Sequence, residues 1–66
     1  MNIAINGEPR TLEDGLSLQQ LISLLGLEHK RLAIEVNQEI VPRSEHDSYI
    51  LKQDDKVEIV QAIGGG

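Results

Sequence analysis

The sequence contains no cysteine, no tryptophan and no phenylalanine, and it has one tyrosine among its 66 residues. Without cysteine, the chain has no disulfide, no thiolate ligand for a metal and no thiol nucleophile. Without large aromatic rings, a core must be filled by branched aliphatic side chains, and a hydrophobic content of 39% is enough for this. The sequence therefore predicts one small domain with an aliphatic core, too small to enclose a deep enzyme cavity.

Positive charge is also scarce, because six Lys and Arg stand against eleven Asp and Glu, for a formal net charge of −5. Nucleic-acid binding needs a basic surface, so nucleic acid is not expected as a partner. No apolar run approaches the length of a membrane span, and residues 1–7 lack the basic start and long apolar run of a signal peptide. We expect a soluble cytoplasmic protein that does not act at a membrane.

Hydrophobic periodicity predicts an α+β fold in which a mixed sheet of about five strands clasps one helix. Pro9 lacks an N–H group, which favours an edge position for the second strand. Residues 43–49 are polar, with room for one short helical turn, and residues 49–51 are expected to pack back on the core. The strands are expected at residues 1–5, 8–12, 32–36, 39–41 and 56–63, and the helix at residues 17–25.

The first two strands are joined by Asn6-Gly7, a pair that favours the type I′ turn of a tight hairpin. A two-residue loop would place Met1 opposite Leu12, whereas a four-residue loop would place Ile3 there. Either register puts Leu12 on the apolar face.

Local signals define the helix at both ends. Ser17 and Gln20 have the spacing of a capping box, in which each side chain accepts a hydrogen bond from the backbone of the other residue. Gly26 is suited to the left-handed position that ends a helix, so that Leu27 can fold back on Ile22. One apolar stripe is formed by Leu18, Leu21, Ile22 and Leu25.

The last predicted strand alternates between two faces. If Val57 and Ile59 face the core, Val60 and Ala62 lie on the outer face of the sheet. Apolar side chains beside the end of the chain form a candidate docking patch for a partner.

The chain ends in Gly64, Gly65 and Gly66, after an expected domain of residues 1–63. Glycine has no side chain to bury and loses the most backbone entropy on ordering, so residues 64–66 are expected to be flexible. They could be a frayed end without function. Alternatively, they could enter a narrow channel and carry the terminal carboxyl about 10 Å into the active site of another protein. A carboxylate is a poor electrophile, so a partner would have to activate it.

Two segments, residues 36–43 (VNQEIVPR) and residues 57–66 (VEIVQAIGGG), resemble the ThiS family of sulfur carriers in bacterial thiamine biosynthesis. The resemblance spans the whole chain and implies a ubiquitin-like β-grasp fold. The third glycine moves the expected reactive residue to Gly66. A second departure is Asp54, at a turn position where such carriers often have glycine.

The resemblance also implies a mechanism and a set of partners. An E1-like adenylyltransferase would use ATP and Mg²⁺ to adenylate the Gly66 carboxylate, with Ile63, Gly64 and Gly65 as the bound tail. Sulfur derived from a cysteine desulfurase would then replace AMP to give a thiocarboxylate, which thiazole synthase would consume. The chain would be a carrier without catalytic activity and without a bound cofactor.

Two alternatives to this function remain at the level of sequence. The chain could carry sulfur for another pathway, such as molybdopterin synthesis, or it could be a ubiquitin-like interaction module whose tail does no chemistry. The acidic composition predicts that partner clefts are basic near Glu35, Glu39 and Glu58, and that salt slows association.

The remaining polar residues give weaker signals. His29 and His46 are isolated in the sequence, without ligand spacing, and are interpreted as solvated side chains rather than metal ligands. Arg43 could orient a partner, pair with Glu45 or simply lie on the surface.

Overall fold

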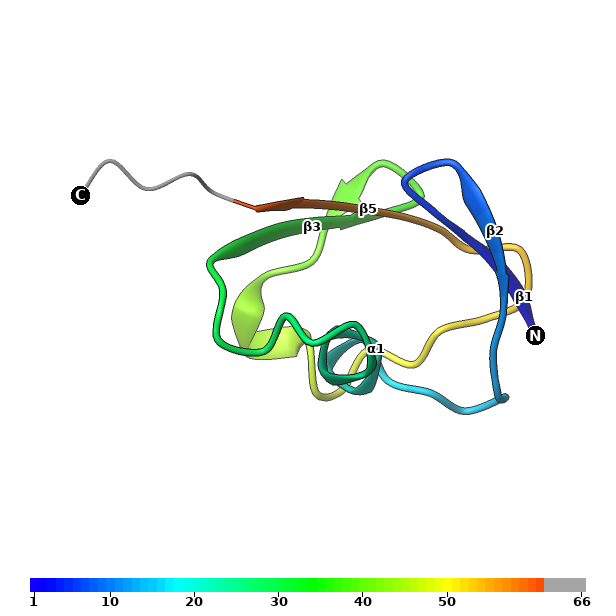
Figure 1. Cartoon of the computed structure of the whole chain (residues 1–66), viewed down its shortest axis with the longest axis horizontal. Helices are drawn as coiled ribbons and strands as arrows, with labels where there is room; N and C mark the ends of the chain where they lie inside the picture. Colours follow the sequence, from blue (N-terminus) through cyan, green and yellow to red (C-terminus); the bar gives the residue numbers. More distant parts are fainter. Residues whose placement is uncertain (62–66) are drawn as a thin grey trace.

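The computed structural model describes residues 1–61 of the chain (Figure 1). Its order of elements, two strands, one helix and three further strands, confirms the order expected from the sequence, with a short 3-10 turn before the last strand. No helix within residues 1–61 is long and apolar enough to cross a membrane. The elements are β1 (Asn2–Ile5), β2 (Glu8–Thr11), α1 (Leu18–Leu24), β3 (Leu32–Val36), β4 (Glu39–Ile40), η1 (Arg43–Glu45) and β5 (Lys56–Gln61).

The five strands form one mixed sheet in the order β2-β1-β5-β3-β4. The first and last strands, β1 and β5, run parallel at the centre, whereas the other neighbouring pairs are antiparallel. Figure 1 shows α1 on one side of this sheet, and no helix of residues 1–61 covers the other face. The strand with Pro9, β2, lies at an edge as expected.

The hairpin of β1 and β2 uses the two-residue loop. Asn6 and Gly7 both have positive φ, 49° and 83°, as a type I′ turn requires. Ile5 therefore pairs with Glu8. Leu12 comes opposite Met1, and its backbone N–H donates to the Met1 carbonyl at an N···O distance of 2.8 Å.

The helix ends are formed as the sequence predicts. The backbone N–H of Gln20 donates to Oγ of Ser17, and the backbone N–H of Ser17 donates to Oε1 of Gln20. At the other end, Gly26 has φ of 72°, and the N–H of Leu27 donates to the carbonyl of Ile22. This Schellman motif satisfies carbonyls that the last turn leaves free.

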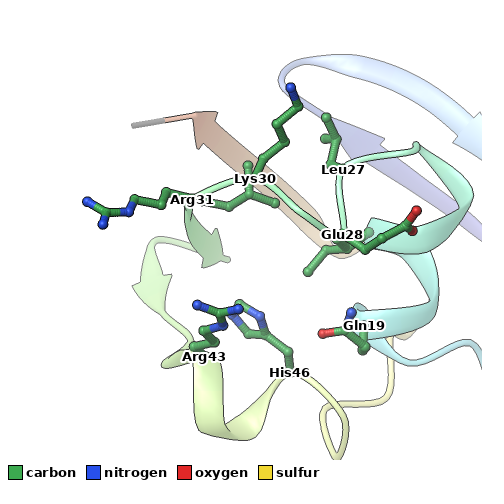
Figure 2. A pocket seen from close by; sticks show the side chains of 9 residues that line it. Gln19, Leu27, Glu28, Lys30, Arg31, Arg43 and His46 are labelled. Carbon is green, nitrogen blue, oxygen red and sulfur yellow. The ribbon is translucent and has the colours of Figure 1, made fainter. Parts of the chain in front are cut away.

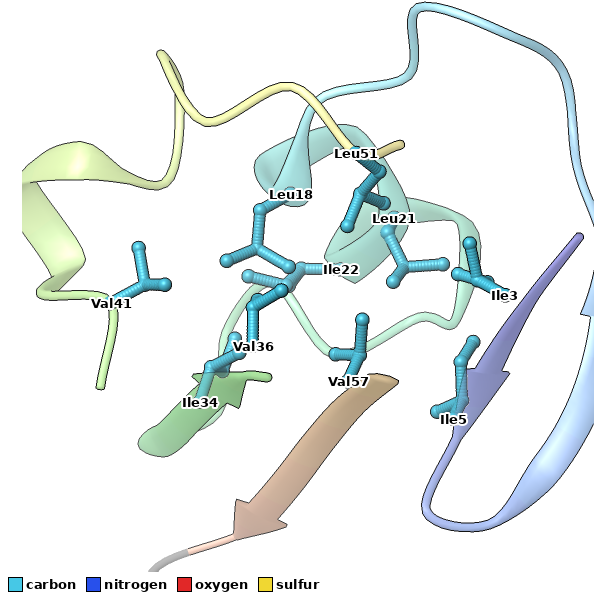
Figure 3. Packing of buried hydrophobic residues seen from close by; sticks show 10 residues of the cluster. All are labelled: Ile3, Ile5, Leu18, Leu21, Ile22, Ile34, Val36, Val41, Leu51 and Val57. Atoms are coloured by element: carbon cyan, nitrogen blue, oxygen red, sulfur yellow. The ribbon is translucent and has the colours of Figure 1, made fainter. Parts of the chain in front are cut away.

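The core lies between α1 and the covered face of the sheet (Figure 3). Side chains from β1, β3 and β5 contact the apolar stripe of the helix, and none of these side chains is aromatic. The buried set is Ile3, Ile5, Leu18, Leu21, Ile22, Ile34, Val36, Val41, Leu51 and Val57.

One strand prediction is too long, and the segment expected to pack back on the core does so, with Leu51 buried and Tyr49 against the core. The strand expected at residues 39–41 ends at Ile40, and Val41 turns its side chain into the core while its N–H still donates to the Ile34 carbonyl. The segment at residues 49–51 contributes one isolated bridge, between Ile50 and Ser17.

Candidate functional site

The central strand β5 carries the chain toward its last residues, and it is held on both sides. On one side it pairs with β3 from Val36↔Val57 to Leu32↔Gln61. On the other side, Asn6 replaces a strand neighbour: its Oδ1 accepts from the Ile59 N–H (2.8 Å) and its Nδ2 donates to the Ile59 carbonyl (3.2 Å). The path of β5 is thus fixed at one end of the sheet, where it lies beside the start of β3 (Figure 1).

The start of β5 is fixed by Asn37, a residue of the segment that resembles sulfur carriers. Its Oδ1 accepts from the backbone N–H of Lys56, and its Nδ2 donates to the carboxylate of Asp55, both at 3.0 Å. Asn37 has φ of 53°, and Asp54 in the facing turn has φ of 70°. The left-handed conformation at Asp54 explains why glycine would also suit this position.

The single tyrosine lies near the same turn. Burial raises the pKa of Tyr49 above its usual value, and the negative charges of Asp55 and Glu39 raise it further. Tyr49 therefore stays protonated at neutral pH and is not suited to act as a base.

The whole predicted tail, and one residue of the candidate patch, lie outside the described residues. This applies to the reactive residue Gly66, to the bound segment Ile63, Gly64 and Gly65, and to Ala62 of the candidate patch. The boundary drawn between residues 1–63 and 64–66 lies there too.

The structure does describe Val60, the other residue of the candidate patch. Val57 is buried and Ile59 half-buried, whereas the Val60 side chain is 63% exposed on the opposite face, which confirms the predicted alternation as far as Val60. Val60 pairs with Ala33, also exposed. The sequence analysis missed Ile40, which pairs with Glu35 on this face and is 74% exposed. We call Ala33, Ile40 and Val60 the outer-face patch.

Two acidic residues lie beside the outer-face patch, on the same face of the sheet. Glu35 and Glu58 are direct cross-strand partners in β3 and β5. Like charges in this position destabilise a sheet. Among residues 1–61, the one salt bridge joins the amino group of Met1 to Asp14, so neither carboxylate is compensated there. The arrangement costs stability within the domain and suits a partner with basic groups.

We expect the substitution Glu58→Gln to raise the free energy of unfolding by about 0.2–1 kcal/mol, because it removes the repulsion by Glu35. Urea denaturation measures this gain. The same variant should bind a basic partner more weakly and with a smaller dependence on salt. Glu13→Gln, a change at an exposed loop residue, is the control and should alter neither quantity. A loss of stability in Glu58→Gln would contradict the repulsion.

The interpretation of His46 as a solvated side chain is wrong, because it is buried, with 4% of its surface exposed. Its Nε2 lies 3.0 Å from the carbonyl oxygen of Val41. The 3-10 turn η1 brings Arg43 and His46 to one pocket, and no Arg43–Glu45 ion pair forms within the described part of the chain. His29 is exposed, and no group of three or more potential metal ligands gathers within residues 1–61.

Comparisons with known proteins agree with this architecture. Residues 3–66 match the model of the ThiS family. The sulfur carrier protein ThiS of Thermus thermophilus is 37% identical over 94% of this chain and 95% of its own length. A thiazole synthase of Magnetococcus marinus is 39% identical over all of this chain, which spans only about a fifth (20%) of that protein.

A solved structure gives the same result in three dimensions. The crystal structure of a thiamine biosynthesis protein (ThiS) from Geobacter metallireducens superposes with a TM-score of 0.86. The two chains are 32% identical, and each is covered completely. The expected β-grasp fold is thereby confirmed, and the chain belongs to the ThiS family.

Proposed function

We propose that this chain is the sulfur carrier for thiazole formation in thiamine biosynthesis, with the sulfur held at the carboxyl of Gly66. The observation that carries the proposal is the match to the ThiS family, which runs through residue 66 and so includes the three glycines. The chain itself would be a carrier and a co-substrate of cytoplasmic enzymes, not an enzyme.

The proposed chemistry follows from the weakness of a carboxylate as an electrophile. An E1-like adenylyltransferase with ATP and Mg²⁺ would join the Gly66 carboxylate to AMP and release pyrophosphate. A persulfide formed by a cysteine desulfurase would attack the acyl carbon through its terminal sulfur, and AMP would leave with one carboxyl oxygen. A thiol of a partner protein would then cleave the resulting acyl disulfide, which leaves the thiocarboxylate on Gly66 and a disulfide on the partner. With no cysteine in the chain, sulfur has no thiol to occupy, so a terminal thiocarboxylate is the form in which it would travel.

The sulfur acceptor in this proposal is thiazole synthase. The support comes from proteins such as the one in Magnetococcus marinus, which is called a thiazole synthase and has a region similar to this whole chain. Domains that are joined in one polypeptide in one organism often act on the same substrate or on each other when they are separate chains in another. We therefore infer that the carrier and the synthase meet directly.

Complementation tests the pathway. A bacterial strain that lacks its own ThiS carrier should grow without added thiazole when it expresses this chain. A strain that lacks its molybdopterin carrier, given the same gene, should stay deficient in molybdenum cofactor. Rescue of only the second strain would overturn the proposal and assign the carrier to molybdopterin synthesis. Rescue of neither strain would overturn sulfur carriage itself.

The outer-face patch is the proposed docking surface for the activating enzyme. Val60→Asp should lower the rate of adenylation about tenfold or more, because it places a charge where apolar surface would be buried. The matched control is Leu24→Asp, since Leu24 is also 63% exposed but lies on the helix, away from this face. Thermal melting checks that both variants are folded. Equal adenylation rates for the two would exclude the patch.

A further inference from the structure

A basic pocket opens on the helix side of the sheet, and the function proposed above does not use it. Its volume is about 250 Å³, and it lies between α1, the segment that connects α1 to β3, and η1 (Figure 2). The residues that matter for its chemistry are Gln19, Glu28, Lys30, Arg31, Arg43 and His46.

The charge of this pocket is opposite to that of the rest of the molecule. Three of the six basic residues of the chain line it, against one of the eleven acidic residues. Within residues 1–61, none of Lys30, Arg31 and Arg43 forms a salt bridge. Three uncompensated cations on a chain of net charge −5 form a localised attractive surface for negative charge.

The wall of the pocket is preformed by His46. A carbonyl oxygen can only accept, so His46 Nε2 carries the hydrogen and donates to Val41. The backbone carbonyl of His46 accepts from the N–H of Gln19 (2.9 Å), which ties η1 to the start of the helix. The other ring nitrogen, Nδ1, has no hydrogen-bond partner within the described residues. Every polar side-chain atom of these residues that is fully buried does have a partner. Nδ1 therefore keeps some exposed surface on a residue that lines the pocket.

The position of the pocket relates it to the end of the chain. Leu32 lines the pocket and is the cross-strand partner of Gln61, the last residue of β5. An enzyme that takes up the residues after Gln61 and approaches this end of the domain from the helix side would therefore contact the pocket. The outer-face patch and the carboxylates of Glu35 and Glu58 lie on the opposite face of the sheet, so the two faces of the domain carry opposite charge.

We propose that this basic pocket is a second docking surface, which binds an acidic surface of thiazole synthase beside the cleft that receives the tail. The inference rests on the proposed function. It adds that the two partner enzymes recognise different faces: the activating enzyme binds the outer-face patch, and thiazole synthase binds the pocket. Figure 2 shows Lys30, Arg31 and Arg43 pointing in different directions rather than converging on one point. Such a spread fits several carboxylates on a protein surface better than one small anion.

Charge reversal at Arg43 tests this inference. Arg43→Glu should weaken binding of the carrier to purified thiazole synthase about tenfold or more, measured by calorimetry, and should reduce its salt dependence. The rate at which the activating enzyme adenylates this variant should stay within about twofold of the wild-type rate. The matched control is Lys52→Glu, which changes the net charge equally but lies just before β5, at the end of the strand opposite Gln61. Lys52→Glu should bind thiazole synthase like the wild type.

The outcomes separate this inference from the proposed function. If the wild type binds thiazole synthase and Arg43→Glu binds equally well, the pocket inference alone is wrong. The inference is also wrong if Arg43→Glu slows adenylation and leaves binding to the synthase unchanged. A third contrary result is that inorganic phosphate shifts the NMR signals of His46 while Arg43→Glu still binds the synthase like the wild type. A wild type that does not bind the synthase would overturn both proposals. Arg31→Glu, at an exposed loop residue, repeats the test if Arg43→Glu does not fold.

Discussion

Removal of Gly66 is expected to reduce thiocarboxylate formation at least about a hundredfold, with no change in the stability of the domain. The deletion withdraws the carboxyl by the length of one residue, and a displacement far smaller than this can cost about a hundredfold in rate at an active site. Stability should be unchanged because glycine has no side chain to bury. The measurements are the rate of sulfur loading, by intact mass spectrometry, and the urea midpoint.

Two further variants define the cause of this loss. Adding one alanine after Gly66 moves the carboxyl in the other direction and should impair loading to a similar extent. Gly65→Phe keeps the length but adds a ring that a channel fitted to glycine cannot admit, so it should also block loading. Full thiocarboxylate formation in the deletion variant would show that the position of the carboxyl does not control the reaction.

Leu21→Ala is expected to lower the free energy of unfolding by about 2–5 kcal/mol. Leu21 lies in the centre of the helix stripe and is fully buried between α1 and the sheet. A domain of this size has a total stability of roughly 3–10 kcal/mol, so the loss is a large part of the whole. We expect the variant to be substantially unfolded near 37 °C and to be loaded slowly, although Gly66 is intact. Urea denaturation measures the first effect and mass spectrometry the second.

The control is Leu24→Ala, the same substitution one turn along the same helix. Leu24 is 63% exposed, so its truncation creates no cavity and should cost less than about 0.5 kcal/mol. Loading of this variant should match the wild type. If Leu21→Ala is unfolded and still loads at the wild-type rate, the folded domain is not what the activating enzyme recognises.

Local chemistry made much of the fold predictable. Asn6-Gly7 accepts the two positive φ values of a tight hairpin, and Ser17 with Gln20 satisfies the first backbone donors of the helix. Gly26 ends the helix for an equally local reason. Each signal acts over a few residues, so neither the register of the sheet nor the order of its strands was needed to recognise it.

The features that sequence reasoning missed depend on contacts between distant segments. The facing of Glu35 and Glu58 follows from the register of β3 against β5, and no pattern within either strand reveals it. Likewise, Arg43 and His46 meet Arg31 only because η1 packs beside the segment that leads into β3. His46 was misjudged because a polar neighbourhood in the sequence does not show that its ring reaches the Val41 carbonyl.

The most direct test of sulfur carriage is the intact mass of the chain after incubation with an E1-like adenylyltransferase, ATP, Mg²⁺ and a sulfur donor. We predict that the mass rises by the difference between a sulfur and an oxygen atom, and that fragmentation places the change at Gly66. An unchanged mass under conditions in which a known ThiS carrier is converted, or a change located at another residue, would contradict the account.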